Sequence, residues 1–236
     1  MNKVTAGNLR MHIEEAFKTK ERGKSRRIPS YFAVYETFLP RYKSKEDINV
    51  LEIGVARGGG LWAWKNYFEN ARNIVGIDCD SGCQKEANPD KNVFVCTGLQ
   101  SDTDFLENVS KTYGPFDIVI DDCSHRSNDQ QTAFNTLFPL LNNDSIYCIE
   151  DLHTAYWPTH NVKGTESTVS FLCNLVTELN PRAVRDKAAG KDKQTGDFNY
   201  LEKHLFSLSF FESIAVIHKL ERTWLEDGPK IASRWY

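Results

Sequence analysis

The chain has 236 residues, with 29 basic and 32 acidic side chains and a formal net charge of -3. This balance excludes a protein that binds nucleic acid mainly through positive charge. Its apolar runs are shorter than the roughly 20 residues that cross a bilayer, and its first residues lack the apolar core of a signal peptide. We therefore expect a cytoplasmic protein without a membrane span, long enough for one large α/β domain.

The predicted elements alternate between helices and strands along the chain. Helical patterns at residues 8–22 and Tyr31–Leu39 come first, and Pro40 stops the second. Strands are predicted at 49–53, 73–78, 93–96, 116–121 and 145–150, with helices at 61–69, 102–112 and 128–141. A helix at 166–179, a polar loop at 183–199 and an antiparallel hairpin of 205–210 with 214–218 complete the chain.

This alternation predicts a mainly parallel sheet with an antiparallel edge. We interpret residues 1–236 as a single domain, with a helical N-terminal cap at 1–45 and a Rossmann-like core at 46–236. Two further features of the sequence are given structural interpretations and no catalytic or binding role. The basic run Lys24-Ser25-Arg26-Arg27 is interpreted as a solvated loop. The six cysteines, which lack C-x-x-C spacing, are interpreted as reduced core residues.

A glycine-rich turn from Gly54 to Gly60 follows the first predicted strand. Glycines allow positive φ angles and close backbone approach, and the next helix offers free N–H groups. Asp78 ends the second strand, where an acidic side chain can accept hydrogen bonds from ribose hydroxyls. The spacing is not the G-x-G-x-x-G of NAD enzymes, and Glu52 suits a cationic, amine-bearing cofactor better than a pyrophosphate. A purely structural turn is the alternative.

Two polar clusters each end an apolar run. Asp121-Asp122-Cys123-Ser124-His125 ends the fourth strand, and Glu150-Asp151-Leu152-His153 ends the fifth. If these strands are neighbours, three or four carboxylates and up to two imidazoles converge at one edge of the sheet. Crowded carboxylates repel one another, so the arrangement favours a bound cation. Helix N-capping by Asp122 or Asp151 is the alternative.

Several of these segments resemble a known family. Leu51-Glu52-Ile53-Gly54 with Asp78 resembles the class I S-adenosylmethionine-dependent methyltransferases. The segments 122–125 and 149–158 (Ile-Glu-Asp-Leu-His-Thr-Ala-Tyr-Trp-Pro) are similar to those of the sugar O-methyltransferases of macrolide biosynthesis, the mycinamicin and tylosin deoxysugar enzymes. The resemblance covers about residues 29–180 and, more loosely, the terminal hairpin. Cys123 and Leu99 depart from the family pattern, and the long N-terminal domain of the macrolide enzymes has no counterpart in this sequence.

The resemblance implies a Rossmann-like α/β fold: a mainly parallel seven-stranded sheet with a C-terminal antiparallel hairpin and N-terminal helices. It implies Mg²⁺, or another divalent cation, held by Asp122, Glu150 and Asp151. His125 would then be the general base, with His153 as its competitor. S-adenosylmethionine would contact residues of the turn and the strand ends: Glu52, Gly54, Gly58, Asp78, Gln100, Ser101 and Asp121. Asp121 could instead support the metal site, and Asp102 could either grip adenine or cap the next helix.

These residues predict an O-methyltransferase that acts on a hydroxyl of a sugar, in a natural product or a polysaccharide. A sugar hydroxyl is a weak acid, so a metal that orients and acidifies it and an imidazole that takes its proton would serve the transfer. Three alternatives stay open: a catechol-type or other small-molecule O-methyltransferase, a dinucleotide oxidoreductase, and a non-catalytic cofactor-binding module. We expect a small-molecule or glycan acceptor and no nucleic acid. The relatives form homo-oligomers.

Overall fold

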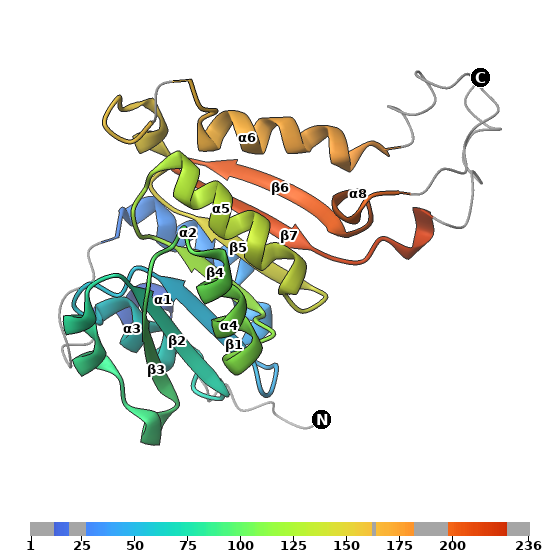
Figure 1. The fold of residues 1–236 in the computed structure, drawn as a ribbon. Coiled ribbons are helices and arrows are strands. Elements are labelled where there is room, and N and C mark those ends of the chain that lie inside the picture. Colours follow the sequence, from blue (N-terminus) through green and yellow to red (C-terminus); the bar gives the residue numbers. More distant parts are fainter. Residues whose placement is uncertain (1–11, 19–26, 162–163, 182–197, 226–236) are drawn as a thin grey trace, which may run out of the picture.

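The computed structural model describes residues 12–18, 27–161, 164–181 and 198–225 (Figure 1). Its centre is one seven-stranded sheet in the order β3-β2-β1-β4-β5-β7-β6. The strands are β1 (Asn49–Ile53), β2 (Asn73–Asp78), β3 (Val93–Thr97), β4 (Ile118–Asp121), β5 (Ser145–Ile149), β6 (Leu205–Phe211) and β7 (Ile214–Lys219). The first five are mutually parallel, and β7 runs antiparallel to both β5 and β6. The mainly parallel seven-stranded sheet with its terminal hairpin is confirmed.

Helices cover both faces of this sheet. They are α1 (Ile13–Lys18), α2 (Pro29–Phe38), α3 (Gly59–Tyr67), α4 (Thr103–Tyr113), α5 (Ser127–Leu137), α6 (Thr168–Asn174) and α8 (Tyr200–His204). The helix expected at 166–179 is shorter than predicted: Ser167 caps α6, and a 3-10 turn at Leu175–Leu179 replaces its second half. The ends of the helix predicted at 8–22 and most of the predicted loop at 183–199 lie outside the described residues. None of the described helices is long and apolar enough to cross a bilayer.

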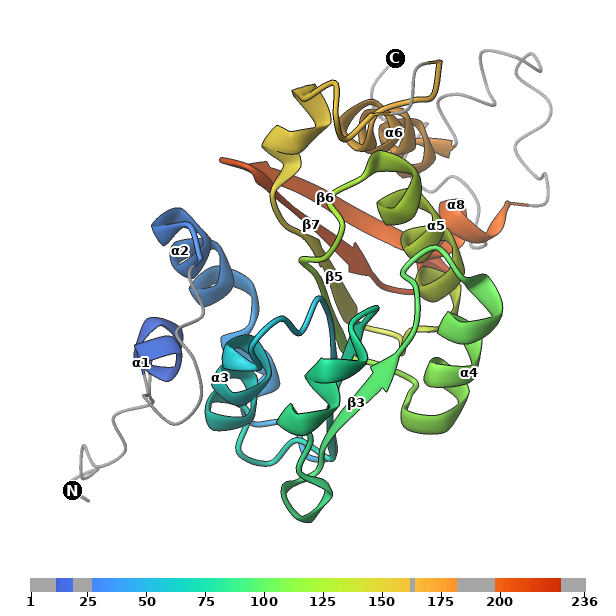
Figure 2. The same cartoon turned by 60° about the vertical axis from the view of Figure 1, so that its left-hand side comes forward.

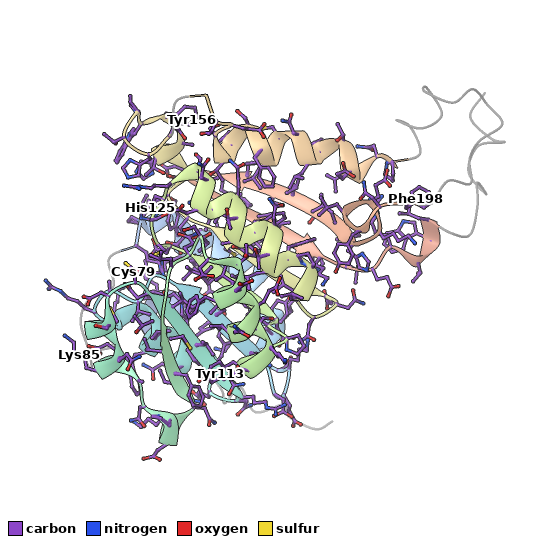
Figure 3. All side chains as sticks on the ribbon, in the orientation of Figure 1. Cys79, Lys85, Tyr113, His125, Tyr156 and Phe198 are labelled. Atoms are coloured by element: carbon purple, nitrogen blue, oxygen red, sulfur yellow. The ribbon has the colours of Figure 1, made fainter. Side chains whose placement is uncertain are left out.

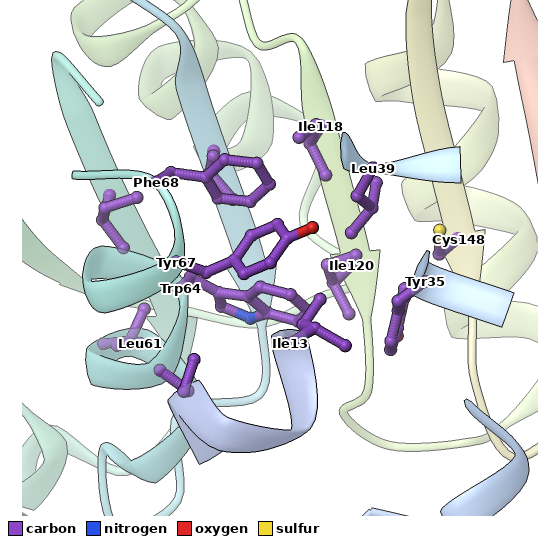
Figure 4. Packing of buried hydrophobic residues seen from close by; sticks show 14 of the residues in the cluster. Ile13, Tyr35, Leu39, Leu61, Trp64, Tyr67, Phe68, Ile118, Ile120 and Cys148 are labelled. Atoms are coloured by element: carbon purple, nitrogen blue, oxygen red, sulfur yellow. The ribbon is translucent and has the colours of Figure 1, made fainter. Parts of the chain in front are cut away.

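The sheet separates two hydrophobic clusters. In Figure 2, α1, α2 and α3 lie on one side of the strands, and α4, α5 and α6 lie on the other. On the first side, Trp64 of α3 packs edge-on against Phe17 of α1 and Tyr35 of α2, with ring centroids 4.9 and 5.3 Å apart. Figure 4 shows Trp64 and Tyr35 in this cluster, with Ile13 beside Trp64. The N-terminal helices are therefore fixed to the same core as β1, β4 and β5.

All six cysteines are free. Cys83 and Cys148 are buried, as expected of core residues. Cys79 and Cys173 are exposed, so their interpretation as core residues is wrong. Cys79 follows the last residue of β2 and lies at the edge of the sheet that carries the polar clusters.

The strand order reverses its direction of growth between β1 and β4, which are neighbours. From β1 the chain adds β2 and β3 on one side, and from β4 it adds β5 on the other. In open α/β sheets, the carboxyl ends of the two strands at such a reversal flank a ligand crevice. The glycine turn follows β1, and the two polar clusters follow β4 and β5, so all three predicted motifs meet at this position.

Candidate active site

The glycine turn after β1 is shaped by close backbone packing. Gly54 has φ +105°, and a Cβ there would overlap the carbonyl oxygen of Asp122. Gly58 has φ +73° and is the N-cap of α3. A Cβ on Gly60 would overlap the carboxylate of Glu52. These three glycines let the turn, the start of α3 and the residues after β4 approach one another closely.

Asp78 ties the end of β2 to this turn. Its Oδ2 accepts hydrogen bonds from the N–H groups of Val55 and Ala56, each at 3.0 Å, and its Oδ1 accepts one from Asp80 N–H at 2.9 Å. Burial raises the pKa of this carboxyl, but the three backbone donors outweigh it and hold the pKa below its usual value. Asp78 is therefore an ionised side chain at the rim of the crevice. Its contact with a ribose stays a prediction.

Gln100 and Asp121 form a buried pair below the crevice. The Gln100 amide donates to both oxygens of Asp121 at 2.7 Å, and its own oxygen accepts from Ser124 N–H at 3.2 Å. Burial raises the pKa of Asp121 to about 8, although the Gln100 hydrogen bond opposes this. Both side chains therefore support the loop after β4. Asp102 accepts from Phe105 N–H and is the N-cap of α4, which agrees with the capping alternative.

Glu52 and Glu150 lie deep in the crevice around one cation. Arg27 Nη2 donates to Glu52 Oε1 at 2.5 Å, and Arg27 Nη1 donates to Glu150 Oε2. The three side chains are 1–2% exposed. Burial raises the pKa of Glu52 to about 7 and that of Glu150 to about 8, against the lowering effect of Arg27. We call Glu52, Glu150 and Arg27 the inner cluster.

Asp122, His125 and Asp151 form a second, more open group, which we call the outer cluster. His125 Nε2 lies 3.6 Å from Asp151 Oδ2 and 4.0 Å from Asp122 Oδ1. One ligand atom from each residue lies within 4.8 Å of the others, and the side chains are 23–29% exposed. Asp122 joins the clusters, because its Oδ2 accepts from Arg27 Nη1 at 2.5 Å. Figure 3 shows His125 at this edge of the sheet.

Helix α2 positions the two carboxylates that end β5. The Tyr35 hydroxyl donates to Glu150 Oε1. One turn earlier, the Tyr31 hydroxyl lies 2.7 Å from Asp151 Oδ1 and accepts from Asp151 N–H at 3.0 Å. Residues four apart lie on one face of a helix, so both tyrosines point to the same strand end. Burial raises the pKa of both tyrosines, so they are neutral donors at physiological pH.

His153 is held away from both clusters. Its Nδ1 lies 2.5 Å from Ser213 Oγ, and its ring packs edge-on against Trp157 at 5.0 Å between centroids. Within the described ranges, the histidine that adjoins the carboxylates is His125. Tyr156 and Trp157 follow directly and are 76% and 48% exposed. This loop is bound to the outer cluster, because Thr154 Oγ1 donates to the carbonyl of His125 at 3.1 Å.

The chain is similar to several characterised methyltransferases. It is 35% identical over 202 residues to 8-demethyl-8-alpha-L-rhamnosyl tetracenomycin-C 2'-O-methyltransferase of Streptomyces olivaceus, a match that covers 81% of this chain and 50% of that protein. It is 30% identical over 197 residues to demethylmacrocin O-methyltransferase of Streptomyces fradiae, covering 78% and 47%. The solved structure of MycE methyltransferase from the mycinamycin biosynthetic pathway, in complex with Mg, SAH and mycinamycin VI, superposes with a TM-score of 0.77 at 25% identity, over 96% of this chain and 57% of that one.

The chain is a homologue of the sugar O-methyltransferases. It spans about half the length of the curated relatives that it matches. A scan against family models finds no match. The resemblance inferred from Asp78 and the segments at 122–125 and 149–158 is thereby confirmed, and so is the Rossmann-like methyltransferase fold.

Two buried polar atoms test whether this homologue suits the cofactors of such enzymes. Glu52 Oε2 is buried and has no hydrogen-bond partner within the described part of the chain, so it can still accept from a cationic amine. His125 Nδ1 is likewise buried without a partner among these residues. The outer cluster offers carboxylate oxygens and an imidazole nitrogen, which suit a divalent ion. The donor set therefore fits both an amine-bearing cofactor and a metal.

Three contributors to this site were not assigned from the sequence. Arg27 was interpreted as part of a solvated loop, which is wrong, because its guanidinium is buried among three carboxylates. Residues 24–26 of that run lie outside the described residues. Tyr35 and Ser213 carried no recognisable signal. A signal for Arg27 did exist, because clustered acids at neighbouring strand ends require a counter-charge. Arg27 lies two residues before α2, the helix whose tyrosines contact the carboxylates of Glu150 and Asp151.

Proposed function

We propose that the chain carries an S-adenosylmethionine- and Mg²⁺-dependent O-methyltransferase activity toward a hydroxyl of a sugar, in a natural product or a polysaccharide. The observation that supports this most is the outer cluster, because it sets two carboxylates and an imidazole beside the glycine turn of a class I methyltransferase fold. The named activities of the relatives support the same reaction.

The carboxylates divide between binding and support. Asp122, Asp151 and Glu150 would hold the divalent ion. Tyr31 fixes the Asp151 side chain, and Tyr35 fixes that of Glu150. When bound, such an ion orients and acidifies acceptor hydroxyls. His125 takes the proton of the acceptor hydroxyl at Nε2, the nitrogen that faces the carboxylates. General-base assistance of this kind contributes about 10²–10⁴-fold in rate.

The cofactor would lie over the glycine turn. Glu52 accepts a hydrogen bond from the amino group of the methionine part at its free Oε2. Asp78 receives the ribose hydroxyls at the end of β2, and Gly54 and Gly58 keep the backbone close to the cofactor. Ser101, Gln100 and Asp121 are proposed to border the adenine, with Gln100 and Asp121 acting through the loop that they support. S-adenosylmethionine, when bound, would supply the methyl group for in-line transfer to the oriented oxygen and would leave as S-adenosylhomocysteine.

The acceptor would pack against the aromatic loop after β5. Trp157 is held edge-on by His153 and His160, with ring centroids 5.0 and 5.4 Å apart, so its orientation is fixed although it is half exposed. A rigid exposed ring on the loop that Thr154 ties to His125 offers a face for the apolar side of a sugar. We propose residues 159–168 and 183–199 as further determinants of acceptor choice; residues 162–163 and 183–197 of these ranges lie outside the described residues.

An activity assay on the purified chain tests this proposal. The chain is incubated with S-adenosylmethionine and two acceptor panels, rhamnosides and other deoxysugar glycosides in one and catechols in the other, with Mg²⁺ or with EDTA. Methylation of glycosides that EDTA abolishes is the expected result. Turnover that is insensitive to EDTA would contradict the metal, and methylation of catechols alone would establish the catechol-type alternative.

We further propose that residues 1–236 act as one domain in the cytoplasm, without nucleic acid, and as a homo-oligomer.

A further inference from the structure

Arg27 connects groups that the proposed function assigns to different partners. Its Nη1 atom alone contacts two of the proposed metal ligands, Asp122 Oδ2 at 2.5 Å and Glu150 Oε2. Its Nη2 contacts Glu52, the proposed partner of the cofactor amine. The guanidinium thus stands where the inner carboxylates converge, and its side chain is almost completely buried.

The position of Nη1 cannot be shared with a metal ion. Mg²⁺ binds carboxylate oxygens at about 2.0–2.1 Å, whereas a charged N–H donor lies about 2.7–2.9 Å from its acceptor. An ion that is ligated by both Asp122 Oδ2 and Glu150 Oε2 therefore takes the space of the nitrogen that now lies between them. The other oxygen of Asp122, Oδ1, lies 4.0 Å from His125 Nε2 of the outer cluster. Ligation of one ion by both Asp122 Oδ2 and Glu150 Oε2 therefore requires the guanidinium to move.

We propose that Arg27 is a built-in competitor of the divalent ion: it holds Asp122 and Glu150 in the metal-free protein and withdraws when an ion takes both carboxylates. This inference rests on the proposed function. Without a cation, three buried or half-buried acids would face one another at the ends of β1, β4 and β5, and their repulsion and lost hydration would destabilise the fold. Arg27 removes that repulsion until the metal replaces it.

The surroundings of Arg27 suit a contact that can be given up. Its Nε is buried and has no hydrogen-bond partner among the described residues, which costs stability in the docked position. Its guanidinium also contacts aromatic rings, with Phe17 at 5.4 Å and Trp64 at 5.7 Å from the guanidinium carbon. Arg27 itself lies outside the strands and helices, two residues before α2, which begins at Pro29. Trp64 also donates to Glu52 Oε1 at 3.1 Å, so its fluorescence should depend on the contacts of the inner cluster.

Metal affinity without turnover provides the first test. Mn²⁺ binding to the full chain is measured by electron paramagnetic resonance, in the absence of cofactor, for wild type, Arg27→Gln, Arg27→Lys and Arg41→Gln. Arg41 is the control, because it pairs with Asp144 on the surface away from both clusters. We expect Arg27→Gln to bind Mn²⁺ at least about fivefold more tightly, since a competitor that occupies the site lowers the apparent affinity by the fraction of molecules it blocks. Arg27→Lys should be intermediate and Arg41→Gln unchanged.

A second measurement protects the test against a variant that folds poorly. Melting temperatures are recorded in EDTA and in Mn²⁺; Arg27→Gln should melt lower than wild type in EDTA and gain more from Mn²⁺. Tryptophan emission of the wild type should shift as Mg²⁺ is added, because Arg27 leaves the Trp64 ring. The shift should be absent in Arg27→Gln.

Three results would contradict the inference. If Arg27→Gln binds Mn²⁺ as the wild type does or more weakly, while the wild type binds, Arg27 is a permanent counter-ion and the proposed function stands. A wild-type emission that does not respond to Mg²⁺ leads to the same conclusion. If neither protein binds Mn²⁺, the metal-dependent function itself is overturned together with the inference. Tighter binding by Arg27→Gln with a lost emission response supports both.

Discussion

Buried charges have different partners at the two edges of the sheet, where the parallel strands β1 to β5 begin (the amino edge) and where they end (the carboxyl edge). At the amino edge, Asp117 precedes β4 and each of its oxygens has a donor: Lys45 Nζ at 2.6 Å and Asn142 Nδ2 at 3.0 Å on Oδ1, and Asn49 N–H at 2.9 Å on Oδ2. At the carboxyl edge, acids outnumber cations among the residues that the structure describes, and Glu52 Oε2 has no hydrogen-bond partner among them. Satisfied charge fixes the strands, whereas unsatisfied charge is available for ligands. Mutations at the two edges should therefore have opposite effects on stability and activity.

The largest effect is expected from Asp122→Asn at the carboxyl edge. This change removes the carboxylate that joins the inner and outer clusters. Activity should fall by more than about 100-fold, since even partners of metal ligands contribute 10–100-fold. The melting temperature in EDTA should stay the same or rise, because an acid is removed from a group of like charges. Methylation rates and thermal denaturation measure both quantities, and a variant that retains full activity would contradict the metal site.

His125→Ala separates the roles of base and ligand. As the base, His125 should contribute to the turnover number, which falls about 10²-fold or more in the variant, while Mn²⁺ binding changes little. His125 Nε2 lies 3.6 Å from Asp151, close enough for the ring to serve as a metal ligand instead. In that case, Mn²⁺ affinity and turnover would fall together. His153→Ala is the matched control, because His153 bonds to Ser213 rather than to the carboxylates.

At the amino edge, Asp117→Ala should lower the stability and leave the activity unchanged, the reverse of what we expect for Asp122→Asn. Asn49 N–H loses its buried acceptor, which costs about 1–3 kcal/mol in the free energy of unfolding. Lys45→Ala is the control, since it removes only the partly exposed cation and leaves the Asp117 acceptor of Asn49 N–H in place, so it should cost less than Asp117→Ala. Urea denaturation gives both values. The folded fraction of Asp117→Ala should methylate at the wild-type rate, and a loss of specific activity would mean that the two edges are not independent.

The sequence predicts which acids meet at the carboxyl edge, but not how deeply each side chain is buried there. Strand positions followed from local apolar runs such as 49–53 and 145–149, and strand order brought Asp122 and Asp151 together because parallel strands end at one edge. The depth of each side chain did not follow, so the division into inner and outer clusters was not predicted. Arg27 lies 95 residues from Asp122 and 123 from Glu150, and its docking depends on tertiary packing that no local pattern encodes.

Trp157→Ala is expected to affect the acceptor without affecting the metal. The ring is half exposed and held by His153 and His160, so its loss removes a contact surface and little buried core. KM for a glycoside acceptor should rise about tenfold, the equivalent of 1.4 kcal/mol, with a smaller change in kcat. Steady-state kinetics at saturating cofactor measure this. An unchanged KM would remove the aromatic loop from the acceptor site.

The smallest effect concerns Lys219, the buried cation of the amino edge. Its Nζ donates to the carbonyls of Pro139 at 3.0 Å and Leu141 at 2.6 Å, and burial lowers its pKa to about 8. Between about pH 8 and the usual pKa near 10.5, the unfolded chain binds more protons than the folded one, so folding gains stability as pH rises. In urea denaturation, the stability of the wild type relative to Lys219→Met should therefore be greater at pH 9.5 than at pH 7.5. An equal difference at both pH values would mean that burial does not lower the pKa of Lys219.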